Sequence, residues 1–91
     1  MLDEYAHDVY RATRDFPREE LYGVSSQLRR AGLSVTLNYI EGYARGRAKV
    51  NKNFLEIAYG SLKESQYLIG FSIKENFLAQ SKGAELLTSR R

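Results

Sequence analysis

Apolar side chains recur every three or four residues along most of the chain, the spacing of an α-helix with one buried face. The first such segment covers residues 2–14 and ends where Asp15-Phe16-Pro17 interrupts the pattern. Proline disfavours helical geometry in the residue before it, so the helix must stop there. We therefore expect a first helix over about residues 2–14.

A second helix is predicted over about residues 19–44, and its apolar face is broad. One stripe steps by three or four residues: Leu21, Val24, Leu28, Ala31, Val35 and Tyr39. A second stripe lies beside it: Leu33, Leu37 and Ile40. A helix with so wide an apolar face is expected at the centre of a bundle. Gly32, which lies within it, is expected to let a neighbouring helix come close.

The third predicted helix covers about residues 50–77 and has two distinct lines of side chains. The first alternates steps of four and three, as in a heptad seam: Leu55, Tyr59, Leu62, Gln66, Ile69 and Ile73. The second consists mostly of small residues: Phe54, Ala58, Ser61, Ser65, Leu68 and Ser72. Small side chains permit close helix approach, so we expect this helix to pack on two neighbours. A break at about residues 80–83 then precedes a short final segment, 84–91.

These elements predict an all-α fold. Helices joined by short loops pack naturally as an up-down antiparallel bundle, here of the four-helix type with a short or truncated last helix. The 91 residues suffice for one domain, 1–91. A chain of this size buries only about two thirds of its unfolded surface, so its stability is expected to be modest. Without cysteine it forms neither a disulfide nor a thiolate metal site.

Charge is unevenly distributed along the chain. Residues 1–20 carry six acids against three arginines, whereas residues 28–53 carry six basic residues against Glu41 alone. A positive segment of this kind is a candidate contact zone for an anionic partner. The N-terminus lacks the pattern of a signal peptide, and no apolar run reaches the roughly 20 residues of a membrane span. We therefore expect a cytoplasmic protein that does not enter a membrane.

Candidate catalytic groups are sparse. His7 is the single histidine, and an exposed helical histidine is its simplest interpretation. A di-metal site in a bundle would need Glu-x-x-His pairs, which the sequence lacks, so no metal or cofactor is expected. Ser25, Ser26 and Ser34 fall inside a predicted helix, without a nucleophile elbow or an acid–histidine pair. We expect a protein that is not an enzyme.

The basic middle segment is the best candidate for a binding surface. Aromatic residues lie among its charges, and aromatics beside arginines can stack on unpaired bases. The predicted nucleic-acid-binding residues are Arg29, Arg30, Arg45, Arg47, Lys49 and Lys52. The alternative is that Tyr39 and Phe54 belong to the core and the charges form a solvated face. In that case the chain is a protein-interaction scaffold without a nucleic-acid role.

Three ordered blocks of the sequence resemble a known family. They are FPREELYGVSSQLRRA (residues 16–31), NYIEGY (38–43) and FLEIAYGSLKE (54–64). Their counterparts in the four-helix bundle proteins encoded within intervening sequences of bacterial 23S ribosomal RNA genes are FPxEExxGLxSQxRRA, NIAEGxxR and FLxIAxGSLxE. Related proteins are the accessory variability proteins of diversity-generating retroelements. The resemblance spans about residues 5–75.

The resemblance implies four-helix protomers assembled as homopentameric rings. It also implies binding of RNA or DNA, and of a reverse transcriptase in the retroelement relatives, through a basic surface. Arg29, Arg30 and Arg45 fall on positions of the family motif, whereas Arg47, Lys49 and Lys52 are assigned on charge alone. The sequence departs from the family at Thr36, where a proline is usual, and in its much shorter fourth helix. A short fourth helix is expected to leave part of the heptad seam uncovered and to favour self-association.

Overall fold

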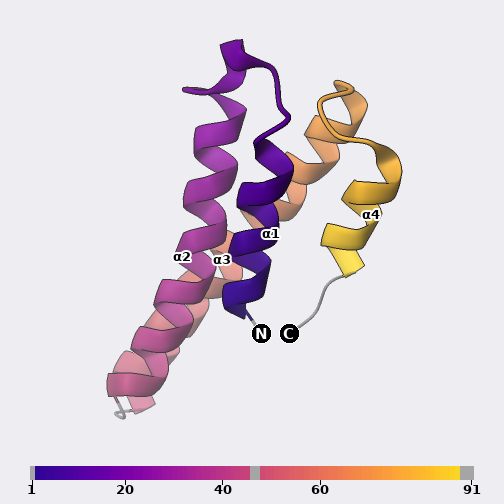
Figure 1. The fold of residues 1–91 in the computed structure, drawn as a ribbon. Helices are drawn as coiled ribbons and strands as arrows, with labels where there is room; N and C mark the ends of the chain where they lie inside the picture. The colour runs from indigo at the N-terminus through magenta and orange to yellow at the C-terminus, as the bar shows by residue number, and fades with distance from the viewer. Residues whose placement is uncertain (1, 46–47, 89–91) are drawn as a thin grey trace.

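The computed structural model describes residues 2–45 and 48–88, which form an all-α bundle (Figure 1). Its helices are α1 (Leu2–Thr13), α2 (Val24–Arg45), α3 (Ala48–Lys74) and α4 (Gln80–Thr88), with a 3-10 turn, η1 (Arg18–Glu20), before α2. The described residues contain no strand. The all-α prediction is therefore confirmed, and the four helices are those of a four-helix bundle. Among the described residues, no helix combines the length and the apolar composition that a membrane span requires.

The second helix begins at Val24, later than the predicted residue 19. The reason lies in the segment after Pro17, where backbone amides bond three residues back instead of four. Glu20 N donates to the carbonyl of Pro17 at 2.9 Å, and Gly23 N donates to the carbonyl of Glu20 at 3.0 Å. The four-residue pattern of an α-helix starts when Gln27 N donates to Gly23 O at 3.0 Å.

The third helix ends at Lys74, before the predicted residue 77, and the fourth begins at Gln80 instead of residue 84. Asn76 adopts a positive φ of 64°, a left-handed conformation that asparagine tolerates and that commonly ends a helix. Phe77 N then donates to the carbonyl of Ser72 at 2.9 Å. The predicted break at residues 80–83 was wrong, because these residues form the first turn of α4.

Gly83 within α4 marks a close helix contact. A Cβ atom at this position would lie 2.7 Å from Ile73 Cγ1 on α3, so only glycine fits without displacing the isoleucine. Gly32 of α2 also lies against a neighbouring helix, but a Cβ there would lie 3.6 Å from the Val9 side chain of α1, an ordinary contact distance. A helix does pack at Gly32, as we expected, although the space would also hold a methyl group.

The core lies where α1 and α4 cover α2 and α3. Its buried apolar residues come from all four helices and from the connections between them: Tyr5, Val9, Phe16, Leu28, Leu68, Ile69, Leu78 and Leu86. Phe16, which follows α1, packs its ring 5.8 Å from that of Phe77, centroid to centroid. The two connections therefore meet over one end of the bundle.

The line of small residues on α3 packs on two neighbours, as predicted. Ser65 and Ser72 are fully buried and donate to the carbonyls of Leu62 and Leu68 in the preceding turn. The single Ser65 proton is used in that bond, so the Tyr5 hydroxyl of α1 must donate to Ser65 Oγ, at 2.6 Å. On the side of α2, Ser34 and Ser61 share a hydrogen bond of 2.7 Å between their hydroxyls.

The heptad seam of α3 is divided. Ile69 is fully buried, whereas Tyr59 is 62% exposed in the part of α3 that extends beyond α1 and α4. In Figure 1 the magenta and pink ends of α2 and α3 extend beyond both of these helices. We call residues 37–45 and 48–59 the uncovered hairpin, and the remainder of the described bundle the covered half.

Candidate nucleic-acid interface

The tip of the uncovered hairpin is basic because α2 ends and α3 begins among the predicted cations. Arg45 is the last residue of α2, and Lys49 and Lys52 lie in the first turns of α3. Lys52 has an exposed side chain. The structure gives only the helical placement of Arg45 and Lys49, and Arg47 lies outside the described residues. Three of the six predicted residues are thus brought to one end of the molecule.

Close packing between the two helices holds this tip together. A Cβ atom at Gly42 would lie 3.3 Å from the backbone carbonyl oxygen of Asn51 and 3.2 Å from Leu55 Cδ2. The glycine therefore allows the end of α2 to approach the backbone of α3. Bringing the helices together also gathers their charges, which favours an anionic partner over a cationic one.

Arg29 is used within the bundle. Its Nε donates to the Thr13 hydroxyl of α1 at 2.7 Å, and its guanidinium carbon lies 5.0 Å from the centre of the Tyr10 ring. The Thr13 hydroxyl in turn donates to the carbonyl of Val9 at 2.9 Å. These contacts hold α1 against α2, so the Arg29 side chain has a structural role in the bundle.

Arg30, the neighbouring residue, is exposed on another side of α2. It borders a polar hollow of about 340 Å³ between α2 and α3, whose other lining residues are Gln27, Ala31, Ser34, Ser61 and Glu64. Fifteen residues separate Arg30 from Arg45, a distance of about 22 Å along a helix. The structure therefore does not join Arg29 and Arg30 to the basic tip, and the acidic Glu64 reduces the positive potential beside Arg30.

Two tyrosines lie on the last turns of α2 near the tip. The rings of Tyr39 and Tyr43 are 4.8 Å apart between centroids at an angle of 58°, and Tyr43 is 61% exposed. A hydrogen bond with Tyr43, and repulsion of a charge on that ring, raise the pKa of Tyr39. The Tyr39 phenol is therefore neutral near pH 7, and the two rings together offer an exposed aromatic surface. Phe54, which we considered together with Tyr39, is half-buried.

The sequence reasoning missed a groove on α3. Asn51, Lys52, Leu55, Glu56 and Tyr59 line a hollow of about 610 Å³. Leu55 and Tyr59 belong to the heptad seam, part of which we expected to be uncovered because the last helix is short. That expectation is confirmed at Tyr59, which is 62% exposed, but the sequence did not indicate a groove beside it.

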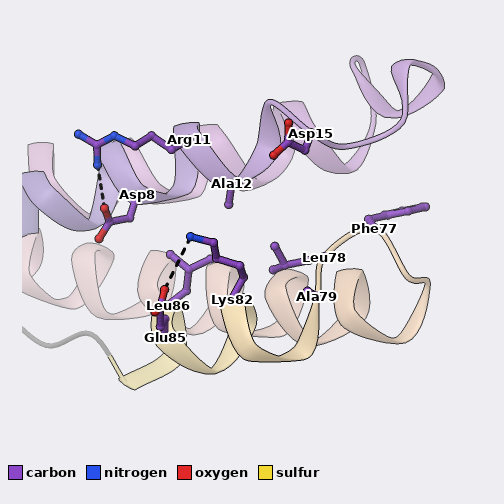
Figure 2. Close-up of a pocket in the computed structure, with 10 residues that line it drawn as sticks. All are labelled: Asp8, Arg11, Ala12, Asp15, Phe77, Leu78, Ala79, Lys82, Glu85 and Leu86. Carbon is purple, nitrogen blue, oxygen red and sulfur yellow. Dashed lines mark hydrogen bonds and ion pairs between the residues drawn. The ribbon is translucent and has the colours of Figure 1, made fainter.

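Another hollow, of about 670 Å³, lies between α1 and α4 (Figure 2). Four of its charged side chains form ion pairs within their own helices: Arg11 Nη1 lies 2.9 Å from Asp8 Oδ1, and Lys82 Nζ lies 3.9 Å from Glu85 Oε1. Figure 2 shows Ala12 on the α1 side of this hollow and Leu86 on the α4 side. Surface pairs of this type contribute about 0–1 kcal/mol each. Among the residues that the structure describes, no group of three or more His, Cys, Asp or Glu could hold a metal.

Comparison with known proteins identifies a family. The family model described as "23S rRNA-intervening sequence protein" matches residues 3–90. A search of curated proteins found no match. The match covers nearly the whole chain, including all three blocks of the resemblance, α4 and the uncovered hairpin.

Proposed function

The chain belongs to the 23S rRNA-intervening sequence protein family, and on that basis we propose that it is a non-enzymatic, self-associating protein that binds nucleic acid through its hairpin tip. The observation that carries the proposal is the gathering of cations where α2 meets α3. Four basic residues, Arg45, Arg47, Lys49 and Lys52, lie between positions 41 and 56 of the sequence, against Glu41 and Glu56.

The family description supports RNA as the first nucleic acid to test. Phosphates are recognised by cations of this kind without regard to sequence. The exposed tyrosines near the tip add aromatic surface on which unpaired bases can stack. The role is therefore that of an accessory factor that holds RNA or DNA, with no chemical step assigned to it.

A fluorescence anisotropy titration with a labelled, structured RNA tests the proposal. If four phosphates are contacted, affinity should fall about 50- to 150-fold when salt rises from about 50 to about 200 mM. Lys52→Ala should weaken RNA binding and should reduce the dependence of affinity on salt by the equivalent of about one phosphate contact. Lys74→Ala, at the far end of the same helix, is the matched control and should change neither. Absence of binding at low salt, or binding that ignores salt, would contradict the proposal.

A second candidate function, a protein-interaction scaffold without a nucleic-acid role, is favoured by the apolar side chains that the hairpin exposes. Leu37 is 58% exposed and Ile40 is 55% exposed. Solvent-facing apolar surface of this kind is typical of interaction sites. Purification after nuclease treatment separates the two functions: a protein partner such as a reverse transcriptase should survive the treatment if the scaffold is correct.

Self-association is common to both candidates, and the resemblance implies five copies. Light scattering at micromolar concentration tests it directly. A mass equal to one chain, 10.4 kDa, would contradict self-association.

A further inference from the structure

The polar hollow between α2 and α3 has no part in the functions proposed above. Its lining residues are Gln27, Arg30, Ala31 and Ser34 from α2, and Ser61 and Glu64 from α3. Their spacing of three and four residues places each set on one side of its helix. The volume of about 340 Å³ lies at the lower end of the range for small-ligand sites.

The two serine hydroxyls of the hollow have one hydrogen left to donate. Ser34 Oγ and Ser61 Oγ lie 2.7 Å apart and share one hydrogen bond. Asn38 Nδ2 donates to Ser34 Oγ at 3.0 Å and to the Ser34 carbonyl at 2.9 Å, which holds Ser34 in place. Two hydroxyls carry two hydrogens, and their shared bond uses only one. Among the residues that the structure describes, no group accepts the second hydrogen, so it is available to a ligand.

Opposite charges reach the hollow from its two helices. Arg30 of α2 and Glu64 of α3 are exposed, and neither forms an ion pair or a side-chain hydrogen bond with another described residue. Arg30 supplies a planar set of donors, and Glu64 supplies two acceptor oxygens. Glu64 repels a phosphate and Arg30 repels a metal cation. The hollow therefore suits a neutral ligand that has donors on one edge and acceptors on another.

Guanine is the RNA base with this arrangement. Its O6 and N7 are adjacent acceptors, to which an arginine donates two hydrogen bonds. Its N1–H and N2–H are adjacent donors, and the two oxygens of one carboxylate accept from both. Adenine and cytosine each carry a ring-nitrogen acceptor beside the amino group, which a carboxylate repels, and uracil has a single ring N–H. The charges of the hollow thus favour guanine over the other three bases.

We propose that the hollow between α2 and α3 binds a guanine base, with Glu64 accepting from N1–H and N2–H and Arg30 donating to O6 and N7. Gln27 and the serine hydroxyls supply further donors. In RNA the base is an unpaired guanine, because Watson–Crick pairing would occupy the edge that Glu64 contacts. The site is separate from the basic tip, so it adds base recognition to a surface that holds phosphates.

Fluorescence anisotropy with two labelled single-stranded RNAs tests base recognition. Both strands are oligouridine, with one central guanine or one central adenine, so their phosphates are identical. The guanine strand should bind about 5- to 150-fold more tightly. Inosine in place of guanine lacks the N2 amino group but keeps N1–H, O6 and N7, and its strand should have an intermediate affinity.

Two variants test the assigned side chains. Glu64→Gln replaces one acceptor oxygen with a donor and should remove the preference for guanine. Arg30→Lys keeps the charge but loses the planar pair of donors, so it should reduce the preference. Glu75→Gln, at an exposed position just after α3, is the matched control and should leave the preference unchanged. Circular dichroism should show the wild-type helix content in all three variants, because these side chains are exposed.

Nuclear magnetic resonance distinguishes guanine in RNA from a free guanine nucleotide. Guanosine monophosphate should shift the amide signals of Ala31 and Ser61 at lower concentration than adenosine monophosphate, which carries the same phosphate. A preference for the guanine strand identifies RNA as the source of the base. A preference between the nucleotides without one between the strands identifies the free nucleotide, and either result supports the site.

The outcomes separate this inference from RNA binding by the tip. Equal affinity for the two strands, together with equal shifts by the two nucleotides, would overturn the guanine site even if Lys52→Ala still weakens RNA binding. A guanine preference that survives Glu64→Gln would overturn it as well. Conversely, a nucleotide preference without salt-dependent RNA binding would support the hollow and contradict the tip.

Discussion

The covered half and the uncovered hairpin are built from the same two helices, yet their side chains have different surroundings. In the covered half, Ser65 and Ser72 are fully buried and hydrogen-bonded, and Ile69 is excluded from water. In the hairpin, Tyr43 and Tyr59 continue the corresponding stripes with more than half of their surface exposed. Burial in this molecule is therefore set by how far α1 and α4 extend, because an apolar stripe is buried only where a neighbour lies against it.

Truncating one isoleucine in each region should give the largest contrast. Ile69→Ala should lower the free energy of unfolding by about 2–5 kcal/mol, because it leaves a cavity in the core. Ile57→Ala, at a site that is 50% exposed in the hairpin, should cost less than about 1 kcal/mol. Urea unfolding followed by circular dichroism, at a dilution where the chain is monomeric, measures both. Equal losses would abolish the distinction between the two regions.

The adjacent arginines of α2 sharpen the comparison between structural and surface cations. Arg29→Ala should cost about 1–2 kcal/mol, since it removes a charge-assisted hydrogen bond to Thr13 and the contact with the Tyr10 ring. Arg30→Ala, at an exposed position, should stay within about 0.5 kcal/mol of the wild type. Thermal unfolding of the two variants is the measurement. A larger loss for Arg30 than for Arg29 would contradict the structural role of Arg29.

Tyr5 gives the covered half a dependence on alkaline pH. Burial raises the pKa of Tyr5, and the hydrogen bond with Ser65 opposes this only in part. The pKa of Tyr5 in the folded protein lies above the unfolded value of 10.0. The protonated phenol therefore contributes its full share of the folding free energy below pH 10, and this stabilisation is lost as pH rises from there toward the folded pKa. Tyr5→Phe should cost about 1 kcal/mol at neutral pH and should lose less stability than the wild type above pH 10. Unfolding curves at neutral and alkaline pH test this, and identical alkaline losses would contradict it.

The smallest effect is expected from two glycines of α2. Gly32→Ala should stabilise the protein by about 0.5–1 kcal/mol, because alanine favours the helix and its Cβ would lie at ordinary contact distance from Val9. Gly42→Ala in the hairpin should not stabilise the protein, because the new methyl group would lie only 3.3 Å from the backbone carbonyl oxygen of Asn51. Midpoints of thermal unfolding distinguish the two. A higher midpoint for Gly42→Ala than for Gly32→Ala would contradict the close packing at the tip.

Much of the fold could be predicted because helical periodicity is a local property. The spacing of apolar residues indicated the helices, Pro17 indicated the end of the first, and the small residues of α3 indicated its close neighbours. The exact ends of the helices were harder to predict from the sequence. Residues 18–23 have a composition that suits a helix, but their hydrogen bonds follow a three-residue pattern. Gly83 resembled a break in the sequence, although it lies within α4 against Ile73.

The candidate site was only partly predictable for the same reason. Charge counts identified the basic segment, but they could not show that Arg29 is bound to Thr13 while Arg30 faces solvent. That difference depends on which side of α2 the first helix occupies. Exposure of Tyr59 depends likewise on the level at which α4 ends.

By itself, the sequence determined that the chain is helical, where its positive charge is concentrated and which stripes of each helix are apolar. These properties follow from the order of residues, because helical spacing and net charge need no knowledge of distant contacts. The tertiary structure alone decided which parts of those stripes are covered and which cations are used within the bundle. Whether a stripe is buried depends on helices that come from distant parts of the chain. The relative lengths of these helices leave the apolar stripes of α2 and α3 exposed at the uncovered hairpin.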